Sequence, residues 1–497
     1  MRGTIPYLDF DLLIRRTEGG YRAQVLSSPA GEATADFTAP FSELELENFL
    51  LRVGRPRRGT RRVGSPEMEA VRTLGNRLYG VVFSGDVRDC WRSSLSEAEA
   101  QNAGLRLRLR IADAPELNDI PWEYLYNASL NRFLSLSDHT PLIRYLDLPE
   151  RVRPLAVDGR LEILIMISSP TDYPSLDVES EWSRLSNALA GLVESGQIRL
   201  KRLAEASLSV LQRELRSGQY HVLHFIGHGG FDPRTQYGVL VLRDEAGRGR
   251  LVAAEHLGAI LHDHRSLRLI VLNACEGSRS SGADPFSGVA QTLVQQGVPA
   301  IIAMQFEITD GAAVIFAEEF YAAIADDYPV DAALVEARKA IFAAGNDIEW
   351  GTPVLYLRAP DGKLFSVNRE AGHPPPQALA RADPPSSALP VQPLGEVAGQ
   401  SGLSVSREGA FAGNKATPRW RLLPYWGRVR FFIFCFFFWP AWVPRIPTWL
   451  KPIVVTIWLL FLISVLYAAY FVVTGTLERS GSSPINLVPG GPTQLVH

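Results

Sequence analysis

The sequence predicts an α/β fold, a sandwich of helices around a mostly parallel sheet, for residues 161–367 of this 497-residue chain. The first observation is that short apolar runs alternate with segments whose apolar residues recur at helical spacing. The second is that runs such as YHVLHFIG are mostly apolar without a regular alternation, which is typical of strands buried on both faces. Alternating strands and helices of this kind indicate βαβ units and a parallel sheet.

The elements expected in this region follow one another without long gaps. In order they are a strand at LEILIMIS, helices over 178–195 and 208–217, strands at YHVLHFIG and RLIVLNAC, a helix over 286–296, a strand at VPAIIAM, helices over 311–325 and 331–344, and a strand at TPVLYLR. Reactive side chains of such sheets lie at the carboxyl ends of the strands. Both His228 and Cys275 fall at such ends.

The first 150 residues are less regular and are expected to form a smaller, separate α+β or α/β domain. DFDLLIRR and YRAQVLSS resemble the arms of a hairpin around Gly19 and Gly20. A helix is expected over 67–79. LRLRLRI alternates like a half-exposed strand, and PWEYLYN follows it.

Composition excludes several classes of protein. Three cysteines without a C-x-x-C pair argue against a disulfide framework or a zinc site, and we expect no metal or cofactor. A net charge of −3 provides no broad basic field, so nucleic acid is not an expected partner. The N-terminus carries acidic residues where a signal peptide would be apolar, which argues against secretion.

The C-terminal part differs in kind from the rest. Residues 368–430 form a Pro/Ala/Ser-rich linker that ends in a basic stretch. Residues 452–473 are uncharged and long enough to span a bilayer as a helix. The apolar segment 431–449 is interrupted by prolines, and we interpret it as interfacial or re-entrant, with a second span as the alternative. A short polar tail, 474–497, ends the chain.

Charge around the long apolar segment predicts its orientation. Basic residues precede it, namely Arg419, Arg421, Arg428, Arg430, Arg445 and Lys451, whereas Glu478 and Arg479 cancel each other after it. By the positive-inside rule, the large N-terminal part is expected in the cytoplasm.

His228, in HFIGHGG, and Cys275, in VLNACEGS, form the candidate catalytic pair. A cysteine attacks as thiolate, and an adjacent histidine both favours the thiolate and returns a proton to the leaving amine. The backbone N–H groups of Gly229 and Cys275 are the expected oxyanion donors, since glycine has no Cβ to obstruct a substrate.

Each residue also has a structural interpretation. A single cysteine at a strand end is usually a small buried hydrophobe, and a single histidine is usually structural. His224 competes with His228 for the catalytic role, because both would lie on the same face of one strand. No glycine flanks His224, and we interpret it as a hydrogen-bonded core histidine.

HFIGHGGFD followed by VLNACEGS resembles the CHAT family of caspase-like peptidases. SSPTDYPSLDVESEW, DPFSGVAQTLVQQGVPAIIAMQFEITDGAA and WGTPVLYLR extend the resemblance over 161–367, and ADAPELNDIPWEYLY resembles the segment that often precedes the peptidase half. The resemblance implies a three-layer, caspase-like sandwich at 151–367 after a smaller α+β or pseudo-caspase-like domain at 1–150. It also implies a His228–Cys275 dyad.

Substrate preference is the least determined feature. By the same resemblance Asn273 lines the P1 pocket. Asp172 lies near the position of a pocket arginine in caspases, where a carboxylate would favour a basic P1 residue, although TDYP is also a turn sequence. Asp232 is either a turn residue or part of the pocket rim.

The expected function is that of a membrane-anchored cysteine endopeptidase cutting a protein substrate at the cytoplasmic face. The family resemblance implies bacterial stress or conflict signalling, with an activating sensor or regulatory protein as partner. The alternative is a catalytically silent scaffold or signalling adaptor that binds its partners at the membrane.

Overall fold

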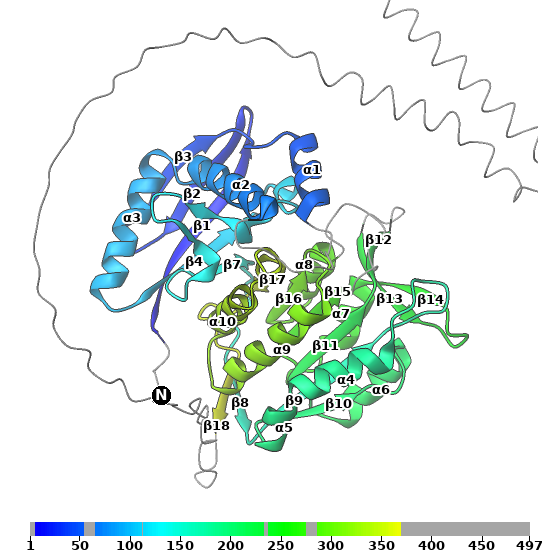
Figure 1. The fold of residues 1–497 in the computed structure, drawn as a ribbon. Helices are drawn as coiled ribbons and strands as arrows, with labels where there is room; N and C mark the ends of the chain where they lie inside the picture. Colours follow the sequence, from blue (N-terminus) through cyan, green and yellow to red (C-terminus); the bar gives the residue numbers. More distant parts are fainter. Residues whose placement is uncertain (1–4, 54–64, 112, 233–236, 275–285, 369–497) are drawn as a thin grey trace, which may run out of the picture. The chain divides into compact units, whose positions relative to one another are not determined.

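The computed structural model describes residues 5–53, 65–111, 113–232, 237–274 and 286–368 (Figure 1). The N-terminal part contains β1 (Tyr7–Thr17), β2 (Gly20–Ser27), β3 (Ala33–Phe37), α1 (Glu43–Val53), α2 (Pro66–Val82), α3 (Gly85–Ala100), β4 (Gly104–Arg110), β5 (Tyr126–Asn127), β6 (Arg132–Phe133) and β7 (Leu142–Tyr145). Short 3₁₀ turns lie at Pro115–Leu117, Trp122–Tyr124, Leu134–Leu136 and Glu349–Gly351.

The remaining elements follow the expected alternation of strand and helix. They begin with β8 (Leu155–Asp158), β9 (Leu161–Ile167), α4 (Val178–Ala188), α5 (Ala190–Glu194), β10 (Ile198–Arg202), α6 (Leu208–Ser217), β11 (Val222–Gly227), β12 (Gly229–Asp232), β13 (Tyr237–Arg243), β14 (Gly249–Ala253) and α7 (Ala254–Leu261). They end with β15 (Leu269–Ala274), α8 (Ser287–Gln295), β16 (Ala300–Met304), α9 (Asp310–Ala325), α10 (Val330–Ala343), β17 (Pro353–Leu357) and β18 (Phe365–Asn368).

An eleven-stranded sheet, in the order β10-β9-β11-β15-β16-β17-β7-β4-β1-β2-β3, is the centre of the fold (Figure 1). Neighbouring strands from β10 to β16 are parallel, and so are those from β17 to β1. β16 and β17 are antiparallel, as are β1, β2 and β3. This confirms the predicted mixed α/β class with a large, mostly parallel sheet. One sheet contains strands from both sides of residue 150, because β17 pairs with β7.

The central strands are buried because their sequences are apolar on both faces. Every residue of β11, β16 and β17 is buried. Two helix groups pack around them: α9 contacts α4 and α10, and α8 contacts α7 and β16. The expected helix over 178–195 is divided into α4 and α5, which meet at the buried Leu189.

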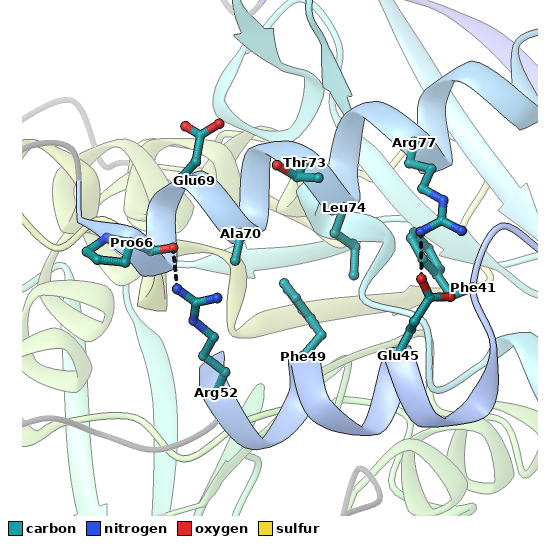
Figure 2. A pocket seen from close by; sticks show the side chains of 10 residues that line it. All are labelled: Phe41, Glu45, Phe49, Arg52, Pro66, Glu69, Ala70, Thr73, Leu74 and Arg77. Atoms are coloured by element: carbon teal, nitrogen blue, oxygen red, sulfur yellow. Dashed lines mark hydrogen bonds and ion pairs between the residues drawn. The ribbon is translucent and has the colours of Figure 1, made fainter. Parts of the chain in front are cut away.

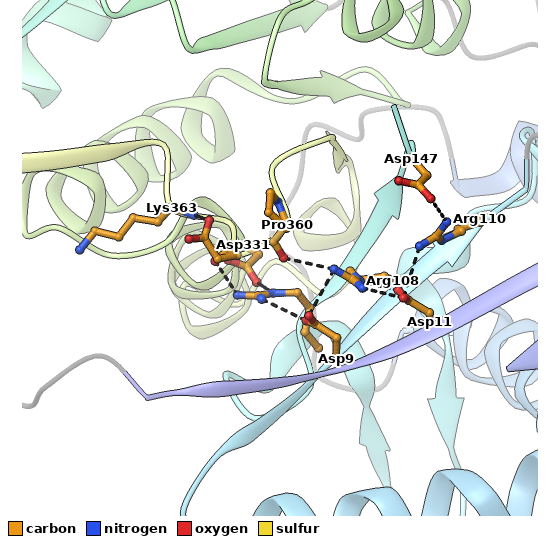
Figure 3. A network of polar contacts seen from close by, with 10 residues as sticks. Asp9, Asp11, Arg108, Arg110, Asp147, Asp331, Pro360 and Lys363 are labelled. Atoms are coloured by element: carbon orange, nitrogen blue, oxygen red, sulfur yellow. Dashed lines mark hydrogen bonds and ion pairs between the residues drawn. The ribbon is translucent and has the colours of Figure 1, made fainter. Parts of the chain in front are cut away.

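β4 has two different faces, as its alternating sequence requires. Its leucines are buried in an apolar core with Phe10 and Trp91. Its arginines lie on the other face, where they pair with aspartates (Figure 3). The expectation of a half-exposed strand is therefore wrong, since Arg106 is as buried as the leucines. The carboxylates that compensate these charges come from elsewhere in the chain.

The N-terminal hairpin is confirmed, with Thr17 opposite Gly20 at its turn. Sequence reasoning missed the three-stranded sheet β12-β13-β14, which follows β11 directly. Among the described residues, none of the helices has the length and apolar character needed to cross a membrane. The linker, apolar segments and tail predicted over 368–497 lie outside the described residues, apart from Asn368 at the end of β18.

Candidate functional site

The carboxyl ends of two neighbouring parallel strands form the centre of the candidate site. β11 and β15 run side by side in continuous register from Val222 opposite Leu269 to Gly227 opposite Ala274. The residue that follows Gly227 in the chain is His228. The residue that follows Ala274 is Cys275, which lies outside the described residues. The register thus pairs the two positions that immediately precede the predicted dyad.

His228 is the described member of that pair. Its side chain is buried, with only 2% of its surface exposed. Neither ring nitrogen has a hydrogen-bond partner among the described residues. Burial lowers the pKa of His228, because a charged imidazolium loses hydration in this environment. The imidazole is therefore neutral near pH 7 and has a nitrogen able to accept a proton.

Tyr173 is a site residue that the sequence interpretation missed. It lies in the loop after β9, and its ring meets the His228 ring edge-on at 5.5 Å between centroids. A Cβ added to Gly249, on β14, would be 2.3 Å from Cε2 of Tyr173. The tyrosine ring is thus placed between β14 and the candidate catalytic histidine. Its segment, SSPTDYP, was one of those on which the family resemblance was based, but nothing in it marks the tyrosine.

Gly229 begins β12, opposite Leu240 of β13. The amide of Val241 donates to the carbonyl of His228 across 3.0 Å, which makes 228 and 241 a hydrogen-bonded pair. In an antiparallel ladder these pairs alternate with non-bonded ones, so the N–H of Gly229 points away from β13. Packing also requires glycine at this position, since an added Cβ would lie 2.2 Å from the Phe286 ring.

The three predicted pocket residues have different environments. Asn273 is buried on β15, and its Oδ1 has no hydrogen-bond partner in the part of the chain that the structure describes. Asp172 is exposed and accepts a 2.6 Å hydrogen bond from the amide of Gly249. That bond joins the loop after β9 to the start of β14. Asp232 ends β12 opposite Tyr237, and its side chain is not described.

His224 lies in the core, as the structural interpretation expected. It is buried on β11, and its Nδ1 is 2.8 Å from the hydroxyl of Tyr321 on α9. Burial lowers the pKa of His224 to about 4. One ring nitrogen is hydrogen-bonded to Tyr321 and the ring is buried. This histidine is therefore a core residue that links the sheet to α9.

A separate groove of about 460 Å³ lies between α1 and α2 (Figure 2). Phe49 and Leu74 contribute apolar surface to it, and Arg77 pairs with Glu45 at 3.1 Å. None of the predicted site residues lines this groove. Within the described ranges, no cluster of three or more histidine, cysteine, aspartate or glutamate side chains has a geometry that could hold a metal ion.

Comparison with protein families identifies the chain. The CHAT domain matches residues 72–378, which is more than half of the sequence and includes every residue of the candidate site. The chain therefore belongs to the CHAT domain family. No curated protein sequence matches it.

Several solved structures match the chain distantly. The separase–securin complex of Saccharomyces cerevisiae matches with 15% identity and a TM-score of 0.31, over 66% of this chain and 23% of the other. The complex of the pro- and mature domains of Porphyromonas gingivalis RgpB matches with 11% identity and a TM-score of 0.34, over 65% and 77%. The chain thus spans about a quarter of the separase chain. At these values the likeness carries no functional conclusion.

Proposed function

We propose that this CHAT-family chain is a cysteine endopeptidase in which His228 and Cys275 form the catalytic dyad. The observation that carries the proposal is the pairing of Gly227 with Ala274 in neighbouring parallel strands. Backbones of paired strands lie about 4.8 Å apart, which suits proton transfer between residues that extend the pair. The lowered pKa of His228, which leaves the imidazole neutral, supports its role as the base.

In the proposed reaction the Cys275 thiol transfers its proton to His228, and the sulfur attacks the carbonyl carbon of the scissile peptide bond. The oxyanion accepts hydrogen bonds from the amides of Gly229 and Cys275. His228 then donates the proton to the leaving amine as the C–N bond breaks, leaving a thioester. Water, deprotonated by His228, hydrolyses the thioester and regenerates the thiol. The N–H of Gly229 points away from β13, which supports its role as an oxyanion donor.

The setting of this activity is part of the same proposal. The apolar segment 452–473 anchors the chain in a membrane, and the linker 368–430 separates it from the catalytic part. The substrates are then proteins at the cytoplasmic face, cut in bacterial stress or conflict signalling when a sensor or regulatory protein activates the enzyme.

One observation favours the alternative of a silent scaffold. A histidine that is only 2% exposed cannot touch a substrate without a rearrangement around it. A chain that never undergoes this change would bind partners without cutting them. The two functions differ in whether Cys275 reacts with an electrophilic peptide.

A cleavage-site profile from a peptide library, run on the full-length chain, tests the proposal. We expect Cys275→Ala to abolish cleavage and labelling by an electrophilic thiol probe, and His228→Ala to lower turnover by roughly 10²-fold or more. Cys90→Ala is the matched control, because Cys90 lies on α3, away from the candidate site. Cleavage that persists in Cys275→Ala would refute the dyad, and a wild-type chain silent with every activator tried favours the scaffold.

The anchor has its own test. A chain that ends at Thr417 lacks both apolar segments and should move from the membrane fraction to the soluble fraction of a cell lysate. A matched chain lacking only residues after Val473 should stay with the membrane. Membrane association of the shorter chain would contradict the anchor without bearing on the dyad.

A further inference from the structure

Two hydrogen-bonded contacts fasten the loop after β9 to the β13–β14 hairpin beside His228. The side chain of Asp172 accepts from the amide of Gly249 at 2.6 Å. The amide and the hydroxyl of Thr171 both donate to the carbonyl of Gly247, at 3.0 and 3.2 Å. We call these two contacts the clasp. The clasp restrains the backbone at Thr171 and Asp172. The next residue in the chain is therefore held against the hairpin.

That residue is Tyr173, and its ring lies between the hairpin and the candidate base. One edge is packed against Gly249 so closely that a Cβ at this position would lie 2.3 Å from Cε2. The ring also meets His228, with 5.5 Å between centroids and 62° between ring planes. Gly249 is thus the residue that allows the tyrosine to lie this close to β14.

We propose that Tyr173 is a positioning residue for His228: its ring holds the orientation of the imidazole and keeps water from it. The proposal rests on the proposed function, since only a catalytic His228 needs a fixed orientation. A histidine base is usually oriented by a hydrogen bond from its second nitrogen. Within the described residues His228 has no such bond, so the aromatic contact is the restraint that the structure provides.

Burial alone accounts for the lowered pKa of His228, with no charged group as a cause. Titratable and charged groups on the surrounding elements are Asp172, Tyr173 and Asp177 on the loop, Asp232 on β12, Tyr237, Arg243, Asp244, Glu245, Arg248 and Arg250 on the hairpin, and His224 on β11. Asp172 and Asp244 are engaged by backbone amides. A change in the titration of His228 on removal of Tyr173 therefore reports hydration of the ring.

Four variants of the full-length chain test the proposal. Tyr173→Ala removes the ring, and Tyr173→Phe keeps it. Gly249→Ala keeps the tyrosine in the sequence, but its added Cβ displaces the tyrosine ring. Asp172→Ala opens one contact of the clasp. We expect kcat to fall on the order of tenfold to a hundredfold in Tyr173→Ala and Gly249→Ala, with KM little changed, and Tyr173→Phe to behave like the wild type. The kcat of Asp172→Ala should lie between that of Tyr173→Ala and that of the wild type.

A measurement that needs no activity separates this proposal from the proposed function. The His228 imidazole can be titrated by NMR in histidine-labelled protein, with His228→Gln to assign its signal. In Tyr173→Ala the pKa of His228 should rise, because water reaches the ring, and in Tyr173→Phe it should not. An unchanged titration and unchanged kcat in Tyr173→Ala would overturn the positioning role. A shifted titration in a chain without any peptidase activity would refute the dyad's function but not the contact.

Discussion

Nε of Arg106 lies 2.5 Å from Oδ2 of Asp331, and both side chains are buried. The two residues are 225 positions apart, on β4 and α10. Arg106 also pairs with the half-buried Asp9 at 3.1 Å and stacks on Tyr7. The ion pair therefore joins β4 to α10, two elements that both lie within the CHAT match of residues 72–378. A buried charge of this kind is tolerated only while its partner remains.

Asp331→Ala should therefore lower the free energy of unfolding by about 3 kcal/mol, because it leaves a buried guanidinium with only Asp9 as counter-charge. Denaturant-induced unfolding of the full-length chain measures the loss. Asp36→Ala, which breaks the exposed pair between Arg22 and Asp36, is the control and should change stability little. Equal effects of the two substitutions would contradict the role assigned to the Arg106–Asp331 pair.

His224 predicts a dependence of stability on pH. Burial lowers its pKa to about 4, against an ordinary value of 6.5. The unfolded chain takes up a proton between these pH values and the folded chain does not, so stability is complete above pH 6.5 and falls as the pH drops towards 4. The loss expected from this residue is about 3 kcal/mol.

Comparing unfolding at pH 7 and pH 4.5 in the wild type, His224→Leu and Tyr321→Phe isolates this contribution. His224→Leu should show a shallower loss of stability with acid, although its stability at pH 7 falls because the Tyr321 hydroxyl loses its partner. Tyr321→Phe keeps the titrating group and should retain the steep loss. The same pH dependence in all three proteins would show that other groups, such as His221 and His228, dominate.

The apolar pattern of the sequence was sufficient to predict the strands and helices whose burial follows that pattern. The strand at 222–227 was predicted because it is mostly apolar on both faces, and α6 because its apolar residues recur at helical spacing. β4 was misjudged because the counter-charge of Arg106 is supplied by a residue 225 positions away. Tyr173 was missed for the same reason: its contacts with His228 and Gly249 depend on the fold of a hairpin that local sequence did not reveal.

Gly229 and Gly230 offer a matched pair of substitutions beside the candidate base. An added Cβ at Gly229 would lie 2.2 Å from Cε1 of the buried Phe286, whereas at Gly230 the nearest atom, of Val239, is 3.8 Å away. Gly229→Ala should cost about 1–3 kcal/mol of stability and reduce any cleavage, since either the strand or Phe286 must shift. Gly230→Ala should keep the fold. Thermal unfolding and the peptide assay, run on both, check this prediction, and comparable losses in both would contradict it.

Two glycines of α2 give opposite predictions on one helix. A Cβ at Gly75 would lie 1.9 Å from the carbonyl oxygen of Tyr124, a backbone atom that cannot move aside, whereas a Cβ at Gly80 meets nothing within 4 Å. Gly75→Ala should therefore destabilise the chain by about 3 kcal/mol. Gly80→Ala should stabilise it by about 0.5–1 kcal/mol, because alanine loses less backbone entropy than glycine when a helix forms. Denaturant midpoints of the two variants should move in opposite directions, and a shift in the same direction would contradict the packing of α2 against Tyr124.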